Sequence, residues 1–228
     1  MFKPADLFDL DQTEHAALFD GCECAWDALK RLKDYVETQV RPGLNNRCDG
    51  VAYIGERVFI GEGTVVEDGA MIKGPAIIGR NCEIRHNAYI REFVLIGDHC
   101  TVGNACEIRH SILLNQAIVP HLNYVGDSIL GHKAHLGAGT KISNYKLTGE
   151  AVTVEMDGRC VDTGLSKFGA LVGDGAEIGC NAVLNPGSII GRGAVIYPAV
   201  NWRGVLAANR IAKNEAGVKV VERLVAQT

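Results

Sequence analysis

The sequence predicts an all-β fold, a left-handed parallel β-helix, with a helical cap at its N-terminus and a small C-terminal extension. Two coupled repeats of six residues carry this prediction, because neither a helix nor a simple strand alternation produces that period. The aliphatic repeat consists of Ile54, Ile60, Val66, Ile72, Ile78, Ile84, Ile90, Ile96, Val102 and Ile108. The small or β-branched repeat, four residues after each of these, consists of Val58, Thr64, Ala70, Ala76, Cys82, Ala88, Val94, Cys100 and Cys106.

Three hexads make one triangular coil, so residues three hexads apart stack at the strand spacing of about 4.8 Å. After Ile108 the frame slips, and the predicted aliphatic positions become Ile112, Ile118, Tyr124, Leu130, Leu136 and Ile142. A third run has aliphatic Val172, Ile178, Leu184, Ile190 and Ile196, with small Ala176, Ala182, Ser188, Ala194 and Val200. Both kinds of position should face the axis, where cysteine acts as a compact apolar residue.

The repeats divide the chain into a helical cap (1–48), the β-helix (49–203) and a C-terminal extension (204–228). Residues 13–40 have apolar side chains at helical spacing, which predicts one or two amphipathic helices over the open end of the β-helix. Residues 146–168 break the hexads and predict an inserted extended loop, a length that is uncommon without a function. Near the C-terminus, "RIAKNEAGVKVVER" alternates around a glycine and predicts a hairpin.

Composition excludes several classes of protein. The net charge is −4 with dispersed lysine and arginine, which argues against a nucleic-acid partner. No apolar run reaches the roughly 18 residues of a membrane span, and the first 20 residues lack a signal-peptide layout. We therefore expect a cytoplasmic protein with no membrane partner and eight reduced cysteines.

Basic residues recur along one outward line of the predicted coils. Arg91 and Arg109 are separated by three hexads, one full coil, and Lys73 lies one coil earlier on the same line. Cations at intervals of about 5 Å repel one another unless an anion lies among them. They are therefore either solvated side chains or a phosphate site, which the arginine fork suits.

A metal site is disfavoured by the spacing of the histidines. Five of them fall outside the inward positions, namely His86, His99, His121, His132 and His135. None of these forms a His-x4-His pair, the ligand arrangement of γ-carbonic-anhydrase-like β-helices, and the cysteines contain no CxxC pair.

Three motifs at characteristic intervals resemble a known family. "GNACEIR", "HLNYVGDS" and "LGAGTKISNY" are similar to the acetyltransferase half of the bifunctional N-acetylglucosamine-1-phosphate uridyltransferase/glucosamine-1-phosphate acetyltransferases. The match covers about residues 89–145 and resumes near 167–179, and the insert 147–166 resembles an archaeal-like branch. The sequence lacks the family's glycine-rich nucleotide loop, so we expect no uridyltransferase activity.

The resemblance implies a site, carried over residue by residue. The catalytic residues would be His121 as general base, Glu107 as its orienting partner and Asn144 near the thioester. Substrate would be bound by Arg91, Arg109, Tyr124, His135 and Lys167, and the acetyl-CoA co-substrate by Asn144, Tyr145, Cys180 and Pro198. His135 replaces a family asparagine and Cys180 a family serine, which leaves the sugar open. Tyr124 also falls in the aliphatic count, so a packing role competes with substrate binding.

The resemblance thus implies an acetyl-CoA-dependent N-acetyltransferase acting on glucosamine 1-phosphate or galactosamine 1-phosphate, assembled as a homotrimer with sites between subunits. The alternatives are a non-catalytic β-helix scaffold or regulator and a γ-carbonic-anhydrase-like metalloenzyme. Loss of function on replacing His121 would distinguish the enzyme from the scaffold.

Overall fold

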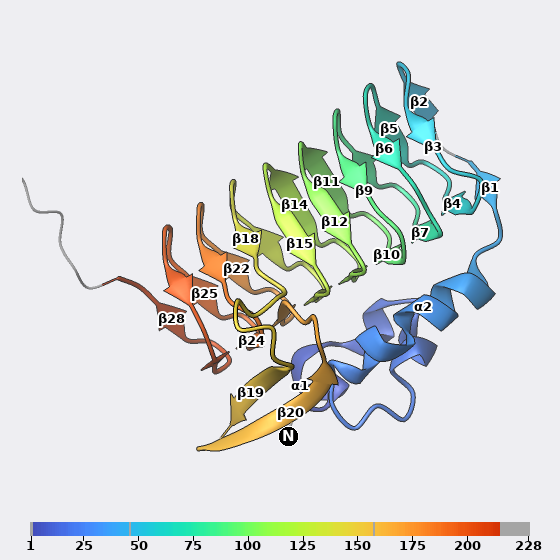
Figure 1. Cartoon of the computed structure of the whole chain (residues 1–228). Coiled ribbons are helices and arrows are strands. Elements are labelled where there is room, and N and C mark those ends of the chain that lie inside the picture. The colour runs from blue at the N-terminus through green and yellow to red at the C-terminus, as the bar shows by residue number, and fades with distance from the viewer. Residues whose placement is uncertain (1, 46, 157, 215–228) are drawn as a thin grey trace, which may run out of the picture.

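The computed structural model describes residues 2–45, 47–156 and 158–214. In these residues three parallel sheets wind into a triangular left-handed β-helix, as the hexads predict (Figure 1). Sheet A contains β1 (Gly43–Leu44), β4 (Val58–Ile60), β7 (Ala76–Ile78), β10 (Val94–Ile96), β13 (Ile112–Leu113), β16 (Ile129–Leu130), β21 (Ala170–Val172), β24 (Ser188–Ile190) and β27 (Val205–Leu206).

The other two sheets complete the triangle. Sheet B contains β2 (Arg47–Asp49), β5 (Val65–Glu67), β8 (Glu83–Ile84), β11 (Thr101–Asn104), β14 (Ile118–His121), β17 (His135–Leu136), β22 (Glu177–Ile178), β25 (Val195–Ile196) and β28 (Ile211–Ala212). Sheet C contains β3 (Tyr53–Ile54), β6 (Met71–Ile72), β9 (Tyr89–Ile90), β12 (Glu107–Arg109), β15 (Tyr124–Gly126), β18 (Lys141–Ile142), β23 (Val183–Leu184) and β26 (Asn201–Trp202). We name the corners A/B, B/C and C/A after the sheets they join.

The two repeats form the core that fills the triangle. The predicted aliphatic and small positions of the first and third runs are buried there, apart from Ile54, which is partly buried against it. Cys82, Cys100 and Cys106 occupy the small positions, as predicted.

The middle run has a different frame from the predicted one. Ile112, Ile118 and Tyr124 face outward, and the inward residues are Leu113, Val119 and Val125. The physical reason is a coil that is one residue shorter than three hexads, so that Ile96 pairs with Leu113 and Ile108 with Val125. The missing residue is at a corner, and a shift of one residue moves every following side chain to the other face of its strand. A second short corner before Leu130 restores the predicted positions Leu130, Leu136 and Ile142.

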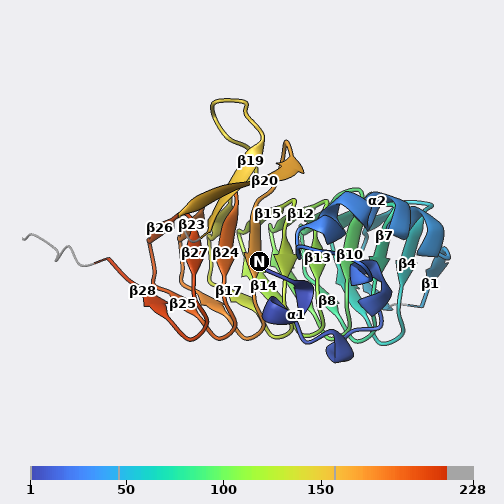
Figure 2. The same cartoon turned by 90° about the horizontal axis from the view of Figure 1, so that it is seen from below.

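The N-terminal segment lies along the outer face of sheet A rather than over the end of the β-helix (Figure 2). It contains α1 (Pro4–Leu7), the 3₁₀ turns η1 (Leu10–Gln12) and η2 (Ala16–Phe19), and α2 (Asp27–Gln39). The physical reason is a ladder of apolar outward residues on sheet A, which the helices bury: Ile77, Leu95, Ile112, Ile129, Leu171 and Ile189. No helix in the described residues is long and apolar enough to cross a membrane.

The insert forms an antiparallel hairpin instead of the expected extended loop. Its strands are β19 (Val152–Met156) and β20 (Arg159–Leu165). Val152, Val154 and Phe168 are buried with the helices, and the Phe168 ring centroid lies 6.2 Å from that of Trp26. The hairpin therefore continues the cover of sheet A toward the later coils.

The β-helix continues past residue 203, the predicted end of that domain. Strands β27 and β28 add to sheets A and B, and β28 pairs in parallel with β25. The hairpin predicted over 210–223 thus begins in a coil strand, and its residues from 215 onward lie outside the described part of the chain.

Candidate functional site

An open cavity of about 600 Å³ gathers six of the residues implied by the resemblance: Arg91, Arg109, Tyr124, Asn144, Tyr145 and Lys167. They come from sheet C and from the corner C/A that follows it. Arg109 ends β12 and Tyr124 begins β15, while Arg91 directly follows β9. Residues from successive coils meet in one cavity because each coil returns the chain to the same face.

Both arginines of the cavity are held by carboxylates. A guanidinium nitrogen of Arg91 lies 2.9 Å from Glu107 Oε1, and the corresponding nitrogen of Arg109 lies 2.8 Å from Asp127 Oδ2. Each guanidinium has five N–H donors, so donors remain for an anion in the cavity. Lys73, on the same predicted line, instead lies 3.8 Å from Glu92 and over the Tyr89 ring, and it does not line the cavity.

Tyr124 is half-buried and faces outward, so it lines the cavity and does not pack in the core. Burial raises the pKa of its hydroxyl, and the charges of Glu107 and Asp127 raise it further. Arg109 and a hydrogen bond with Asn144 act in the opposite direction. The net effect keeps this phenol protonated, hence able to donate a hydrogen bond, at neutral pH.

Three other predicted residues lie at corner B/C, across sheet C from the arginines. His121 ends β14 and is exposed, and its backbone N–H donates to Asn123 Oδ1. Cys180 and Pro198 are exposed on successive coils of the same corner. Glu107, the expected orienting partner of His121, makes its hydrogen bond to Arg91 instead.

His135 lies on the outer face of sheet B, separate from the cavity. Its Nδ1 lies 2.7 Å from Glu177 Oε2 on the next coil. Within the described ranges, no group of three or more His, Cys, Asp or Glu side chains is arranged to hold a metal ion.

Sequence reasoning missed His110 and Asp127, which contact the cavity residues from corner C/A. Asp127 Oδ1 lies 2.9 Å from His110 Nδ1, and Oδ2 accepts from Arg109 and from the Asn144 side chain. The signal was present in the sequence, since both residues directly follow a cavity strand. It becomes visible only when the shortened coil is known, because that coil pairs Arg109 with Gly126 and so stacks His110 under Asp127.

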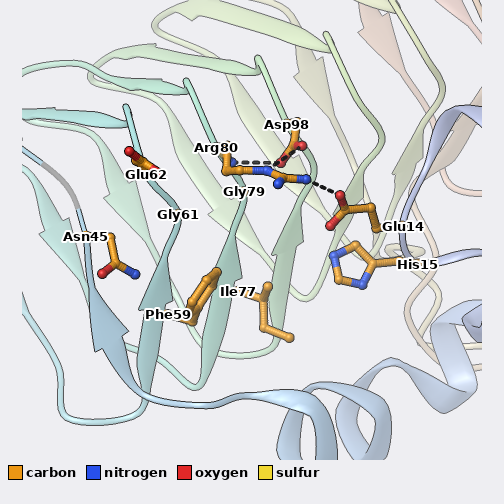
Figure 3. A pocket seen from close by; sticks show the side chains of 10 residues that line it. All are labelled: Glu14, His15, Asn45, Phe59, Gly61, Glu62, Ile77, Gly79, Arg80 and Asp98. Atoms are coloured by element: carbon orange, nitrogen blue, oxygen red, sulfur yellow. Dashed lines mark hydrogen bonds and ion pairs between the residues drawn. The ribbon is translucent and has the colours of Figure 1, made fainter.

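Two further cavities set this site in context. One of about 410 Å³ shares Tyr145 with it and is lined also by Lys146 and Arg203, beside the insert. Another of about 660 Å³ lies between sheet A and the N-terminal segment (Figure 3). Its arginine, Arg80, points between Glu14 and Asp98 and bonds to both, so its charge is already balanced.

Comparisons with known proteins match the central coils. The family model described as "GMPPB C-terminal domain" matches residues 72–165. A bifunctional sugar-1-phosphate nucleotidylyltransferase/acetyltransferase from Sulfurisphaera tokodaii is 37% identical over 90 residues, 40% of this chain and 22% of that protein. The bifunctional protein GlmU of Methanococcus vannielii is 37% identical over 86 residues, 38% of this chain and 20% of that protein. The matched segment thus spans about a fifth of the length of these relatives.

Among solved structures, a perosamine N-acetyltransferase from Caulobacter crescentus, in complex with CoA and GDP-perosamine, aligns over 80% of this chain and 60% of its own. It is 17% identical with a TM-score of 0.23, which is too low to support an argument. The segment 72–165 includes every candidate residue except Lys167, Cys180 and Pro198. Over this segment the chain is similar to sugar-1-phosphate nucleotidylyltransferase/acetyltransferases, as its motifs indicate, and to the C-terminal domain of the matching family model.

Proposed function

We propose that the protein transfers an acetyl group from acetyl-CoA to the 2-amino group of an amino-sugar 1-phosphate, glucosamine 1-phosphate or galactosamine 1-phosphate. The observation that carries this proposal is the cavity in which Arg91, Arg109 and Lys167 converge beside Tyr124, Asn144 and Tyr145. Three cations beside two tyrosines and an amide suit a small anionic sugar. Names of relatives support acyl transfer to a sugar but do not decide between these acceptors.

The arginines and the lysine would bind the phosphate. Arg109 keeps free donors beyond its bond to Asp127, and charge-assisted bonds from arginine to phosphate are among the strongest in proteins. Lys167 is exposed at the end of the insert and can approach the same anion. The protonated Tyr124 hydroxyl would donate to a sugar oxygen.

His121 would act as the general base. The lone pair of the amine attacks the thioester carbonyl carbon, a C–N bond forms, and the amine proton passes to His121. The C–S bond then breaks, and the thiolate of CoA takes up a proton as the acetamide is released. Asn144, whose amide keeps a second N–H beyond its bond to Asp127, would donate to the developing oxyanion, because the backbone N–H groups of Gly137 and Gly139 already donate to Ile178 O and His121 O. Glu107, now on Arg91, would orient His121 only through its second oxygen or after exchanging partners.

Acetyl-CoA would lie with its thioester at Asn144 and Tyr145. The neighbouring cavity that shares Tyr145 gives the rest of the molecule space along the later coils, with Lys146 and Arg203 available for its phosphates. Cys180 and Pro198 lie at corner B/C, the other edge of sheet C, and would contact acetyl-CoA from there.

We expect a homotrimer with its sites in the clefts between subunits. Within one chain His121 and His135 lie toward sheet B, whereas the cationic cavity lies at corner C/A. In a trimer, the edge of one subunit that carries His121 would face corner C/A of a neighbouring subunit. At an acceptor concentration well below the KM of Arg109→Ala, mixed His121→Ala and Arg109→Ala proteins should then be more active than the sum of the two alone, and no gain after verified subunit exchange would contradict shared sites.

The direct test is CoA thiol release with acetyl-CoA and each amino-sugar phosphate. Arg109→Ala should raise the KM for the acceptor about 10–100-fold, the value of one or two charged hydrogen bonds, with little change in the KM for acetyl-CoA. Arg80→Ala is the matched control, because Arg80 also pairs with an aspartate on the following coil but lies at corner A/B, away from the cavity at corner C/A. If no amino-sugar phosphate supports thiol release and CoA does not raise the Tm, the proposal fails.

A further inference from the structure

Corner C/A carries a buried carboxylate that joins three neighbouring coils. His110 and Asp127 occupy equivalent places on successive coils and both have a left-handed backbone, with φ of 42° and 47°. Aspartate and histidine adopt this conformation more readily than most residues. The backbone fixes the corner as well, since the Asp127 N–H donates to Arg109 O and its carbonyl accepts from the Gly169 N–H.

The Asp127 side chain has three partners from this site. Oδ2 accepts from Arg109 at 2.8 Å and from the Asn144 amide, and Oδ1 lies 2.9 Å from His110 Nδ1. Asp127 is only 5% exposed. A buried carboxylate with fewer donors would cost stability, so these contacts define one side-chain position.

Asn144 and the neighbouring Tyr124 are also tightly packed, against the backbone of Gly126. A Cβ added to Gly126 would lie 2.6 Å from Asn144 Nδ2 and 2.7 Å from the Tyr124 hydroxyl. Asn144 and Tyr124 therefore rest on the bare backbone immediately before Asp127. A shift of the carboxylate would move the amide expected near the thioester and the guanidinium expected at the phosphate together.

We propose that Asp127 is the positioning residue of this site, holding Arg109 for the phosphate and Asn144 for the thioester at a fixed mutual distance, with His110 locking its second oxygen. This inference rests on the proposed function for the roles of Arg109 and Asn144. It adds a residue whose effect comes through two others, because Asp127 itself is turned away from solvent behind them.

Charge and positioning predict opposite changes in phosphate binding when Asp127 is neutralised. Asp127 places a negative charge near the expected phosphate, so neutralising it should tighten anion binding if charge were its only influence. Positioning predicts weaker binding, because Arg109 would no longer be fixed. The sign of the change in the acceptor KM therefore separates the two explanations.

The experiment compares Asp127→Asn with wild type and with Asp98→Asn. Asp98 is the matched control: it binds Arg80 on the preceding coil just as Asp127 binds Arg109, and Figure 3 shows that pair at a different corner. We expect Asp127→Asn to raise the acceptor KM and to lower kcat, each about tenfold. The KM for acetyl-CoA should change less than the acceptor KM, because Tyr145, Lys146 and Arg203 would still contact the rest of CoA. Asp98→Asn should leave all three constants unchanged.

An acceptor KM that stays equal or falls in folded Asp127→Asn would overturn the proposal while leaving the acetyltransferase intact. A purely structural role would lower the Tm and the active fraction, and hence the apparent kcat, without raising the acceptor KM. If Asp127→Asn does not fold, His110→Asn gives the same test, since it removes one partner, keeps the carboxylate and suits the left-handed backbone; a change of about threefold in the same direction is expected.

Binding of inorganic phosphate, measured by calorimetry, separates this proposal from the proposed function. If wild type transfers no acetyl group but binds phosphate, and Asp127→Asn binds it more weakly than Asp98→Asn does, the positioning of Arg109 stands without the enzyme. If wild type binds no phosphate, Arg109 has no anion to hold and the inference is wrong.

Discussion

The outer faces of sheets A and C are built on the same coils, yet one is covered and the other carries the candidate site. They differ in the outward residues of each hexad. The residue between the small and the aliphatic one differs, and so does the residue after the aliphatic one, which is Gly79 or Gly97 on sheet A but Arg91 or Arg109 on sheet C. On sheet A the residue between the two inward ones is apolar, as in Ile77, Leu95 and Ile112, and the helices and hairpin bury it. On sheet C it includes Glu107, Tyr124 and Lys141, and the face remains open. The inward residues thus specify the coil, whereas the outward residues determine whether a face is covered by helices or remains open.

The largest effect should come from the open face. His121→Ala should lower kcat about 10²–10⁴-fold, the usual value of a general base, with an unchanged Tm because the side chain is exposed. Steady-state thiol release and thermal melting measure the two quantities. His86→Ala, another exposed histidine, should retain activity. Full activity of His121→Ala would favour the scaffold alternative.

The covered face should respond in the opposite way, through stability. Leu95→Ala removes a fully buried side chain beneath α2 and should lower the free energy of unfolding by about 3 kcal/mol. Thr101→Ala, the equivalent position on sheet B, is partly exposed and should cost less than about 1 kcal/mol. Urea denaturation of both variants gives the comparison, and equal losses would show that the helices contribute little to the packing of Leu95.

The outward residues of both faces could be predicted only where the hexad frame was assigned correctly. The periods of the first and third runs predict the core, because a hexad requires the same inward pair in each coil. The frame between Ile108 and Leu130 could not be predicted, since an omitted corner residue leaves no mark in composition and the apolar Ile112 and Ile118 fit either frame. A packing role therefore competed with substrate binding for Tyr124 until its pairing with Glu107 showed that it faces outward.

The position of the helices was partly readable. Residues 13–40 showed an apolar helix face, but the partner predicted for it, the open end of the β-helix, was wrong. The apolar triplets "VFI", "AII" and "VLI", which recur once per coil, mark the ladder on sheet A that the helices cover. The motifs implied eleven site residues, of which six line one cavity, and their roles stay a prediction. The pairs within the site could not be predicted, since the contacts Arg91–Glu107 and Arg109–Asp127 depend on coil length and side-chain direction.

A smaller effect on activity should follow from adding a methyl group at Gly126, beneath Asn144 and Tyr124 on the open face. Gly126→Ala puts a methyl group within 2.6 Å of Asn144 Nδ2, so Asn144 and Tyr124 must move. We expect kcat/KM to fall about tenfold. Gly43→Ala on sheet A, where the nearest atom would lie at an ordinary 3.6 Å, should leave activity unchanged. Unaltered kcat/KM in Gly126→Ala would mean that the positions of Asn144 and Tyr124 do not limit the reaction.

The smallest expected effect concerns pH and the covered face. His15 Nδ1, just before η2, lies 3.0 Å from the hydroxyl of Tyr35 in α2. Burial lowers the pKa of His15 below 6.5, although Glu14 and Asp98 partly oppose this. Below pH 6.5 the unfolded chain then binds a proton that the folded chain excludes, so folding stability falls as the pH drops through this range and levels off below the folded pKa.

His15→Gln removes that proton linkage. The decrease in Tm between about pH 7.5 and about pH 5.5 should therefore be smaller in His15→Gln than in wild type, by a few degrees at most. An equal decrease in both proteins would assign the acid sensitivity to other groups. His15 belongs to the cover of sheet A and does not line the cavity of Arg91 and Arg109. The kcat at pH 7.5 should therefore be the same in His15→Gln and in wild type. This result would separate the stability of the covered face from the chemistry of the open face.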